Sequence, residues 1–267
     1  MLGGTGGTVA VILRRRRQKN PDGSMTLVEH LDELRTRLII SVAAVIVGMA
    51  IAWPLYRAVF NLLTNPYCNF MKHHPQLALH PQNPCALAYI SIVEPFLVKI
   101  KTVGALGLCL ALPVVLYELW RFVTPGLTSK ERRYAIPFVL SSVALFILGG
   151  YFALLTLPKG LAFLLGFAGT SRIYTVLSVG KYVGFVTLLI LAFGASFEFP
   201  LLLISLTMVG VLSSLKLRAW RRYAVVVIAI VAAVITPSQD WFTMTALMVP
   251  LLVFYELSIL VARLMKK

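Results

Sequence analysis

Carboxylate side chains are scarce in this sequence. Only 10 of its 267 residues are Asp or Glu, against 25 Lys or Arg, so the formal net charge is +15. Charged residues of both signs make up 13% of the chain, and hydrophobic residues make up 59%. So little polar surface cannot cover a water-soluble globule of this length. The composition therefore excludes a soluble protein and predicts an integral membrane protein.

Three other features are missing. The apolar runs lack the alternation of polar and apolar residues that a transmembrane β-barrel shows, which leaves helical spans as the architecture. The cysteines, Cys68, Cys85 and Cys109, lack the close paired spacing of a metal site, so no metal ion is predicted. No internal repeat relates the first three apolar runs to the last three, whereas many secondary transporters are built from repeats.

Six apolar runs predict an all-α polytopic membrane protein. The first four are long enough to cross about 30 Å of hydrocarbon at about 1.5 Å per residue. The last two are shorter and must use their flanks or thin the bilayer locally. We expect four transmembrane helices at residues 38–60, 96–117, 135–157 and 182–209, and two more in the short apolar windows between Arg222 and Thr236 and between Asp240 and Arg263.

The basic residues are distributed unevenly among the loops. Eighteen of the 25 Lys and Arg lie before residue 38, in the loops after the second and fourth spans, and at the C-terminus. By the positive-inside rule, both termini are cytoplasmic, and the positive charge then needs no nucleic-acid partner. We expect a basic mobile tail that contacts anionic membrane lipids (1–24), a six-helix membrane domain (25–263) and a short cytoplasmic C-terminus (264–267).

Several acidic residues gather where the first helix begins. Thr26 and Glu29 have the spacing of a capping box, so a helix is expected to begin there. Glu33 lies four residues before Arg37, a spacing that allows an ion pair on a helix. Taken alone, this acidic segment is a solvated collar below a membrane span. The topology nevertheless places Glu131 on the same membrane face as Glu33. Two carboxylates on one face can hold arginine guanidinium groups. The alternative is that Glu131 only balances the arginines beside it.

Two carboxylates lie within predicted spans. Glu198 is near the middle of the fourth span, and Pro200 follows it and is expected to bend the helix. A carboxylate at this depth costs free energy unless it faces water, finds a partner or stays protonated, so functional and structural roles both stay open. Glu256 lies nearer the end of the sixth span, where it is either functional or a carboxylate near the interface that snorkels or pairs with Arg263.

The predicted loop at residues 61–95 carries Cys68 and Cys85. This loop faces an oxidising compartment, so the two thiols can close a disulfide that restricts the unfolded chain by about 3 kcal/mol. The other possibility is that both thiols stay free. Cys109 lies inside the second span, and we interpret it as a small apolar packing residue.

Four motifs, in this order along the chain, strongly resemble those of the TatC family, whose members are the core receptor subunits of the twin-arginine protein translocase. They are HLDELRTRL (30–38), EPF (94–96), FVTPGLTSKERR (122–133) and FGASFEFP (193–200). The tail length and the cysteine pair resemble actinobacterial members. The resemblance implies a cup-shaped, six-helix protein of the bacterial cytoplasmic membrane that recognises paired arginines in the signal peptides of folded cargo. It also implies export driven by the proton motive force, with no active site for bond chemistry and no cofactor.

The resemblance also implies roles for individual residues. Glu33 and Glu131 match the acidic residues that bind the twin arginines, with Leu34 and Arg35 in the same patch. Glu198 matches a buried glutamate in the concave wall. These assignments place signal-peptide binding at the cytoplasmic face.

A second region matches the place where single-span TatA-type and TatB-type partner subunits dock in an oligomeric complex. Its residues are Asp240, Thr243, Met244, Thr245 and Glu256. Some members of the family carry a glutamine where this chain has Met244, so packing replaces a side-chain amide contact here.

Two other functions compete with this interpretation. A proton-coupled small-solute secondary transporter would use Glu198 and Glu256 as proton carriers, but the missing repeat and the absence of other ionisable groups in the span cores count against it. A structural membrane anchor would leave Glu198 unexplained.

Overall fold

The computed structural model describes residues 27–74, 82–83, 85–123, 135–166, 176–238 and 240–265. Its regular elements are all helices. They are α1 (Leu27–His73), α2 (Glu94–Val123), α3 (Ala135–Gly166), α4 (Val179–Phe197), α5 (Phe199–Met208), α6 (Ser214–Ala219), α7 (Arg221–Ile235) and α8 (Trp241–Leu264). This confirms the predicted all-helical fold class.

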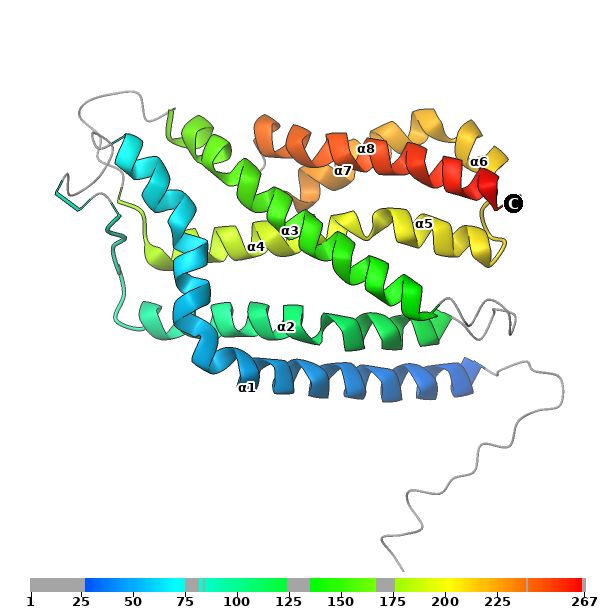
Figure 1. Cartoon of the computed structure of the whole chain (residues 1–267), viewed down its shortest axis with the longest axis horizontal. Helices are drawn as coiled ribbons and strands as arrows, with labels where there is room; N and C mark the ends of the chain where they lie inside the picture. The colour runs from blue at the N-terminus through cyan, green and yellow to red at the C-terminus, as the bar shows by residue number, and fades with distance from the viewer. Residues whose placement is uncertain are drawn as a thin grey trace, which may run out of the picture.

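The helices form an elongated array in which the two ends of the described chain lie close to one face. Figure 1 shows that α1 begins and α8 ends at the same end of the array, which we call the terminal face; the opposite end is the distal face. Helix α2 ends and α3 begins at the terminal face as well. This arrangement agrees with termini on one side of the membrane, and the assignment of that side to the cytoplasm stays a prediction from the basic residues.

Among the described residues, five helical segments are long and apolar enough to cross a membrane. The fourth of them joins α4 and α5 into one segment, Val179–Met208. Helix α7 has only 15 residues, a rise of about 22 Å at the usual helical pitch. A sixth crossing therefore depends on α7 and on local thinning of the bilayer, and the six-span count stays a prediction.

Helix α1 is longer than its apolar run. We expected the first span to end at residue 60 and a loop to follow, but this expectation was wrong, because α1 continues to His73 and contains Pro54 and Pro66. A proline inside a helix removes one hydrogen bond and bends the helix without necessarily ending it. Figure 1 shows the last part of α1 turning away from the first part and crossing α2 and α4 at the distal face.

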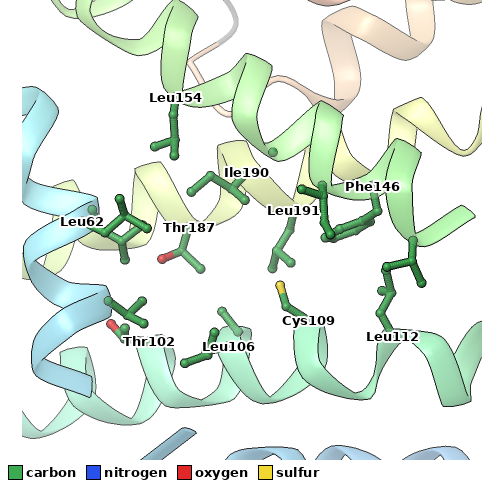
Figure 2. Close-up of a pocket in the computed structure, with 16 residues that line it drawn as sticks. Leu62, Thr102, Leu106, Cys109, Leu112, Phe146, Leu154, Thr187, Ile190 and Leu191 are labelled. Carbon is green, nitrogen blue, oxygen red and sulfur yellow. The ribbon is translucent and has the colours of Figure 1, made fainter. Parts of the chain in front are cut away.

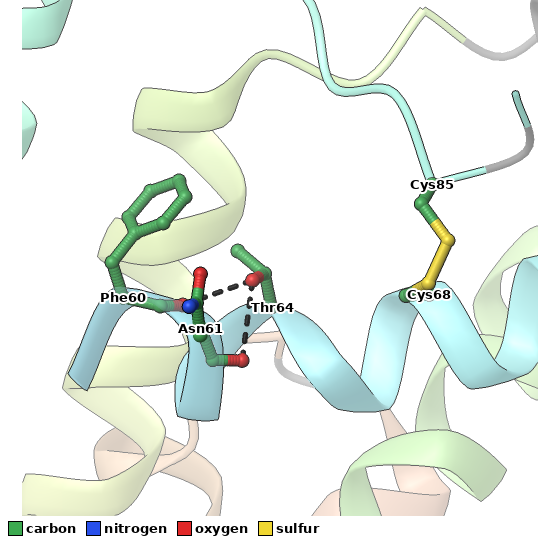
Figure 3. The surroundings of a disulfide bond; sticks show 5 residues. All are labelled: Phe60, Asn61, Thr64, Cys68 and Cys85. Atoms are coloured by element: carbon green, nitrogen blue, oxygen red, sulfur yellow. Dashed lines mark hydrogen bonds between the residues drawn. A yellow bond between two sulfur atoms is a disulfide. The ribbon is translucent and has the colours of Figure 1, made fainter. Parts of the chain in front are cut away.

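A disulfide fixes this last part of α1. Cys68 and Cys85 are joined, with their Cα atoms 4.5 Å apart (Figure 3). One turn earlier, the Thr64 hydroxyl donates hydrogen bonds to the carbonyls of Phe60 and Asn61, at 2.9 and 3.3 Å. The end of α1 is thereby linked to the segment that leads into α2.

Helix α4 lies at the centre of the largest apolar core. Its residues Tyr182, Val186 and Phe193 are almost completely buried, and they pack with residues of α1, α3 and α8. The buried Tyr182 hydroxyl donates a hydrogen bond of 3.0 Å to the carbonyl of Leu63 in α1. Helix α4 therefore connects the first half of the chain to the second.

Helices α1 and α2 approach each other closely where both carry a glycine. A Cβ atom on Gly107 of α2 would lie 2.7 Å from the backbone nitrogen of Met49 in α1, and one on Gly48 would meet the carbonyl of Gly107. Small residues at such crossings allow membrane helices to pack backbone to backbone. This contact positions the terminal halves of α1 and α2 relative to each other.

Candidate functional site

A guanidinium group held between two carboxylates lies where α1 and α2 meet at the terminal face. Arg37 forms ion pairs with Glu33, one turn earlier on α1, and with Glu118 on α2, where Nη1 and Oε2 are 2.8 Å apart. The exposed fractions of these side chains are only 12%, 6% and 9% for Arg37, Glu33 and Glu118. Removing one partner of such a buried pair is costly, because the remaining charge loses its compensation.

The ends of the two helices are held together by an aromatic contact beside these charges. His30 in the first turns of α1 stacks on Phe122 at the end of α2, with ring centroids 4.3 Å apart. The two residues belong to the motifs HLDELRTRL (30–38) and FVTPGLTSKERR (122–133). The contact links the first turns of α1 to the end of α2 beside the carboxylates of both helices.

A cavity of about 400 Å³ opens beside Arg37. Its lining includes three carboxylates and two guanidinium groups, so its formal charge is −1. The lining residues are Asp32, Glu33, Thr36, Arg37, Ile40, Glu118 and Arg121. In a chain with a net charge of +15, this is a local site that favours a cation.

The structure locates three of the four residues that we predicted to bind signal peptides. Glu33 lines the cavity, whereas Leu34 and Arg35 are exposed on the surface of α1. Glu131 lies outside the described residues. Glu118 was not predicted, because no local pattern shows that it pairs with a residue 81 positions away.

Glu198 lies at the break between α4 and α5, and Pro200 stands in the first turn of α5. The helix is therefore interrupted at the place where the sequence predicts a bend in the fourth span. The carboxylate accepts a hydrogen bond at Oε2 from Ser142 of α3, and its buried Oε1 has no hydrogen-bond partner among the described residues. Glu198 also lines a cavity of about 280 Å³ that α7 and α8 help to enclose, through Val227 and Leu251 among others.

The residues predicted to dock partner subunits face different ways at the start of α8. Asp240 caps α8 by accepting hydrogen bonds from the backbone and hydroxyl of Thr243, at 2.8 and 2.6 Å, and Thr243 is buried. Burial opposes ionisation of Asp240, but hydrogen bonds from Ser238 and Thr243 outweigh this effect and lower its pKa. Met244 packs against the core, and Thr245 lines a cavity of about 570 Å³ formed by α8 and Phe152 of α3.

Glu256 forms an ion pair with Arg221, the first residue of α7, and both side chains are half exposed. Pairing with Arg263, one of the alternatives predicted for this carboxylate, was wrong. The correct partner could not be found from spacing along one helix, because Arg221 belongs to a different helix. A pair this exposed contributes little to stability.

Another unpredicted contact holds the distal face together. Glu94, the first residue of α2, accepts hydrogen bonds from the Ser178 hydroxyl and from the backbone nitrogens of Gly180 and Ile90, at 2.6 and 2.7 Å for the two nitrogens. Ala88 and Ser178 also form a parallel bridge. The Glu94 carboxylate therefore joins the segment before α2 to the start of α4.

A mainly apolar cavity of about 260 Å³ lies between α1, α2, α3 and α4 (Figure 2). Cys109, which we predicted to be a packing residue, lines this cavity. The hydroxyls of Thr102 and Thr187 also belong to it, and neither has a hydrogen-bond partner among the described residues. The described residues contain no group of three or more His, Cys, Asp or Glu that could hold a metal ion.

Long apolar helices define a polytopic membrane protein, and a charged cavity opens at its terminal face. A family model described as Sec-independent protein translocase protein (TatC) matches residues 29–250. The chain therefore belongs to the TatC family and is a core subunit of the twin-arginine translocase, a multi-pass protein of the bacterial plasma membrane.

Relatives and solved structures agree with this assignment. The Sec-independent protein translocase protein TatC of Aquifex aeolicus is 40% identical over 242 residues, which cover 90% of this chain and 95% of the relative. That of Frankia casuarinae is 39% identical over 255 residues, which cover 95% of this chain and 70% of the relative. A crystal structure titled as the twin arginine translocase receptor TatC is 39% identical, with a TM-score of 0.72 over 90% of this chain and 100% of that chain.

Proposed function

We propose that this chain binds the twin arginines of signal peptides at the terminal face, with Glu33 and Glu131 as the receptor carboxylates. The observation that carries this proposal is the burial of Glu33 in a cavity with a formal charge of −1. A guanidinium fork can pair with a carboxylate through two parallel hydrogen bonds, whereas a lysine ammonium is a point charge. Such a cavity favours arginine over lysine.

The surface of α1 next to the cavity suits the hydrophobic stretch of a signal peptide. Leu31, Leu34 and Leu38 are all exposed along α1, at helical spacing. An apolar segment that follows an arginine pair can lie along this stripe while its arginines stay at the membrane surface. This supports Leu34 as part of the peptide site, and the exposed Arg35 lies beside it.

We further propose that α8 contributes the docking surface for TatA-type and TatB-type single-span subunits. The cavity of about 570 Å³ along α8 supports this, because Thr245, Val249 and Val253 line it together with Phe152 of α3. Asp240 and Thr243 would shape this surface by fixing the start of α8, and Met244 would support it from the core. Glu256 would contribute at the other end of α8.

In this account the subunit acts by binding, and the proton motive force drives export of the folded cargo. Glu198 then serves as a polar group in the concave wall, along the route of the inserted peptide. Membrane lipids surround the apolar faces of the helices.

Binding of an R-R signal peptide and of the same peptide with K-K to the full-length protein in lipid nanodiscs tests the proposal. Glu33→Gln is expected to remove most of the preference for R-R. Glu29→Gln, which changes an exposed carboxylate one turn earlier on α1, is the matched control and is expected to keep the preference. An undiminished R-R preference in Glu33→Gln would show that the receptor site is elsewhere.

A further inference from the structure

The guanidinium group of Arg37 occupies a site that has the chemistry expected for a cargo arginine. Its Nη1 pairs with Glu118 and its Nη2 with Glu33, so each carboxylate takes one nitrogen of the fork. The two carboxylates come from different helices and are nearly buried. An arginine from another chain would meet the same two groups if Arg37 moved aside.

One hydrogen-bond donor of Arg37 is left unsatisfied by the described part of this site. Its Nε–H is buried and has no acceptor among the described residues. A buried donor without an acceptor loses its hydrogen bonds to water and forms none with the protein, which costs free energy. This cost makes the buried position of the Arg37 side chain less stable. The cavity also keeps a formal charge of −1 with Arg37 in place, so it still attracts a second cation.

Exchange of one guanidinium for another is energetically different from loss of the guanidinium. If Arg37 leaves and nothing replaces it, two nearly buried carboxylates lose the guanidinium that pairs with both of them, which is costly. If a second guanidinium enters as Arg37 swings into the adjoining cavity of about 400 Å³, each carboxylate keeps a partner. A lysine ammonium cannot span both carboxylates with a planar fork, so the exchange selects for arginine.

We propose that Arg37 is a resident guanidinium that occupies the Glu33–Glu118 pair in the empty receptor, and that an arginine of the signal peptide displaces it. Glu118 is then a further carboxylate of the arginine site, and Arg37 sets its specificity by competition. This inference rests on the proposed function, because it takes Glu33 to be a receptor carboxylate. It goes beyond that function by assigning roles to Arg37 and Glu118.

The competition makes a prediction that a purely structural role for Arg37 does not make. If Arg37 leaves the site open in only a fraction of the receptor molecules, the apparent affinity for the peptide is reduced by that fraction. Arg37→Gln is therefore expected to bind the R-R peptide more tightly than the wild-type protein, by roughly fivefold or more. Arg37→Lys keeps the charge but loses the fork, and is expected to fall between the two.

The test uses full-length protein in nanodiscs and a fluorescent R-R peptide, with the K-K peptide measured in parallel. Glu118→Gln is expected to weaken R-R binding roughly tenfold and to leave K-K binding nearly unchanged. Arg57→Gln removes an exposed arginine from the same helix and is the matched control, with no change expected.

The outcomes separate this inference from the proposed function. Weaker or unchanged R-R binding in a well-accumulated Arg37→Gln variant would overturn the displacement of Arg37. If Arg37→Gln fails to accumulate, Arg37→Lys decides, and unchanged or weaker binding in that variant would overturn it equally. An R-R preference that survives Glu33→Gln would instead reject the proposed receptor site itself.

Discussion

The carboxylate at the break between α4 and α5 gives the sharpest test of function against stability. Glu198 accepts a hydrogen bond from Ser142, whose side chain is completely buried. In Glu198→Ala the Ser142 hydroxyl loses this acceptor, which is expected to cost about 1–3 kcal/mol of unfolding free energy. In Glu198→Gln the amide carbonyl can still accept the bond, so the expected loss is about 1 kcal/mol or less.

Ser142→Ala is the matched control, because it removes the same hydrogen bond but keeps the carboxylate. The assays are thermal unfolding of the purified full-length protein and export of a folded reporter with an R-R signal peptide. We expect Ser142→Ala to retain export, Glu198→Gln to retain stability but lose most export, and Glu198→Ala to lose both. Export by Glu198→Gln at the wild-type level, or an equal loss of export in Ser142→Ala, would refute a transport role for the carboxylate.

Three further predictions concern the scaffold. Replacing Cys68 and Cys85 by serine is expected to lower the unfolding free energy by about 3 kcal/mol relative to the oxidised wild-type protein, because the disulfide closes a loop with a sequence separation of 17. The reduced wild-type protein is the control and should lose a similar amount. Gly107→Val places side-chain atoms against the α1 backbone and is expected to destabilise the protein by several kcal/mol, whereas Gly104→Val, where a Cβ meets nothing within 4 Å, should be tolerated in the same thermal assay. Asp240→Ala is expected to cost about 1 kcal/mol by removing the cap of α8. Folding lowers the pKa of Asp240, so the difference in unfolding free energy between Asp240→Ala and the wild type should be complete above about pH 4. This difference should shrink as the pH falls through the lowered pKa. A difference that does not change with pH would contradict the cap.

Apolar runs located the helices because membrane spans must bury nearly all of their surface in lipid or protein. The sequence also predicted the break near Glu198, since Pro200 cannot continue the hydrogen bonding of a helix. It missed the extension of α1 from residue 61 to His73. That segment is stabilised by distant contacts, such as the bond from Tyr182 to Leu63, which no local pattern encodes.

The sequence predicted only part of the candidate site, for the same reason. Glu33 could be selected because its motif and the topology place it at one membrane face. Its packing with Arg37 and Glu118 depends on how α1 and α2 approach each other at Gly107, and this crossing joins residues far apart in the chain. Likewise, the pairing of Glu256 with α7 depends on tertiary structure rather than on helical spacing.

The most direct test of the receptor site is site-specific photocrosslinking from positions 33 and 131 to a signal peptide in native membranes. We expect both positions to crosslink to an R-R peptide, the K-K peptide to crosslink weakly, and unlabelled R-R peptide to compete. Position 57, on the same helix as Glu33 but towards the distal face, is the control and should not crosslink. No crosslink from position 33, or equal crosslinks with R-R and K-K peptides, would contradict an arginine-binding site at the terminal face.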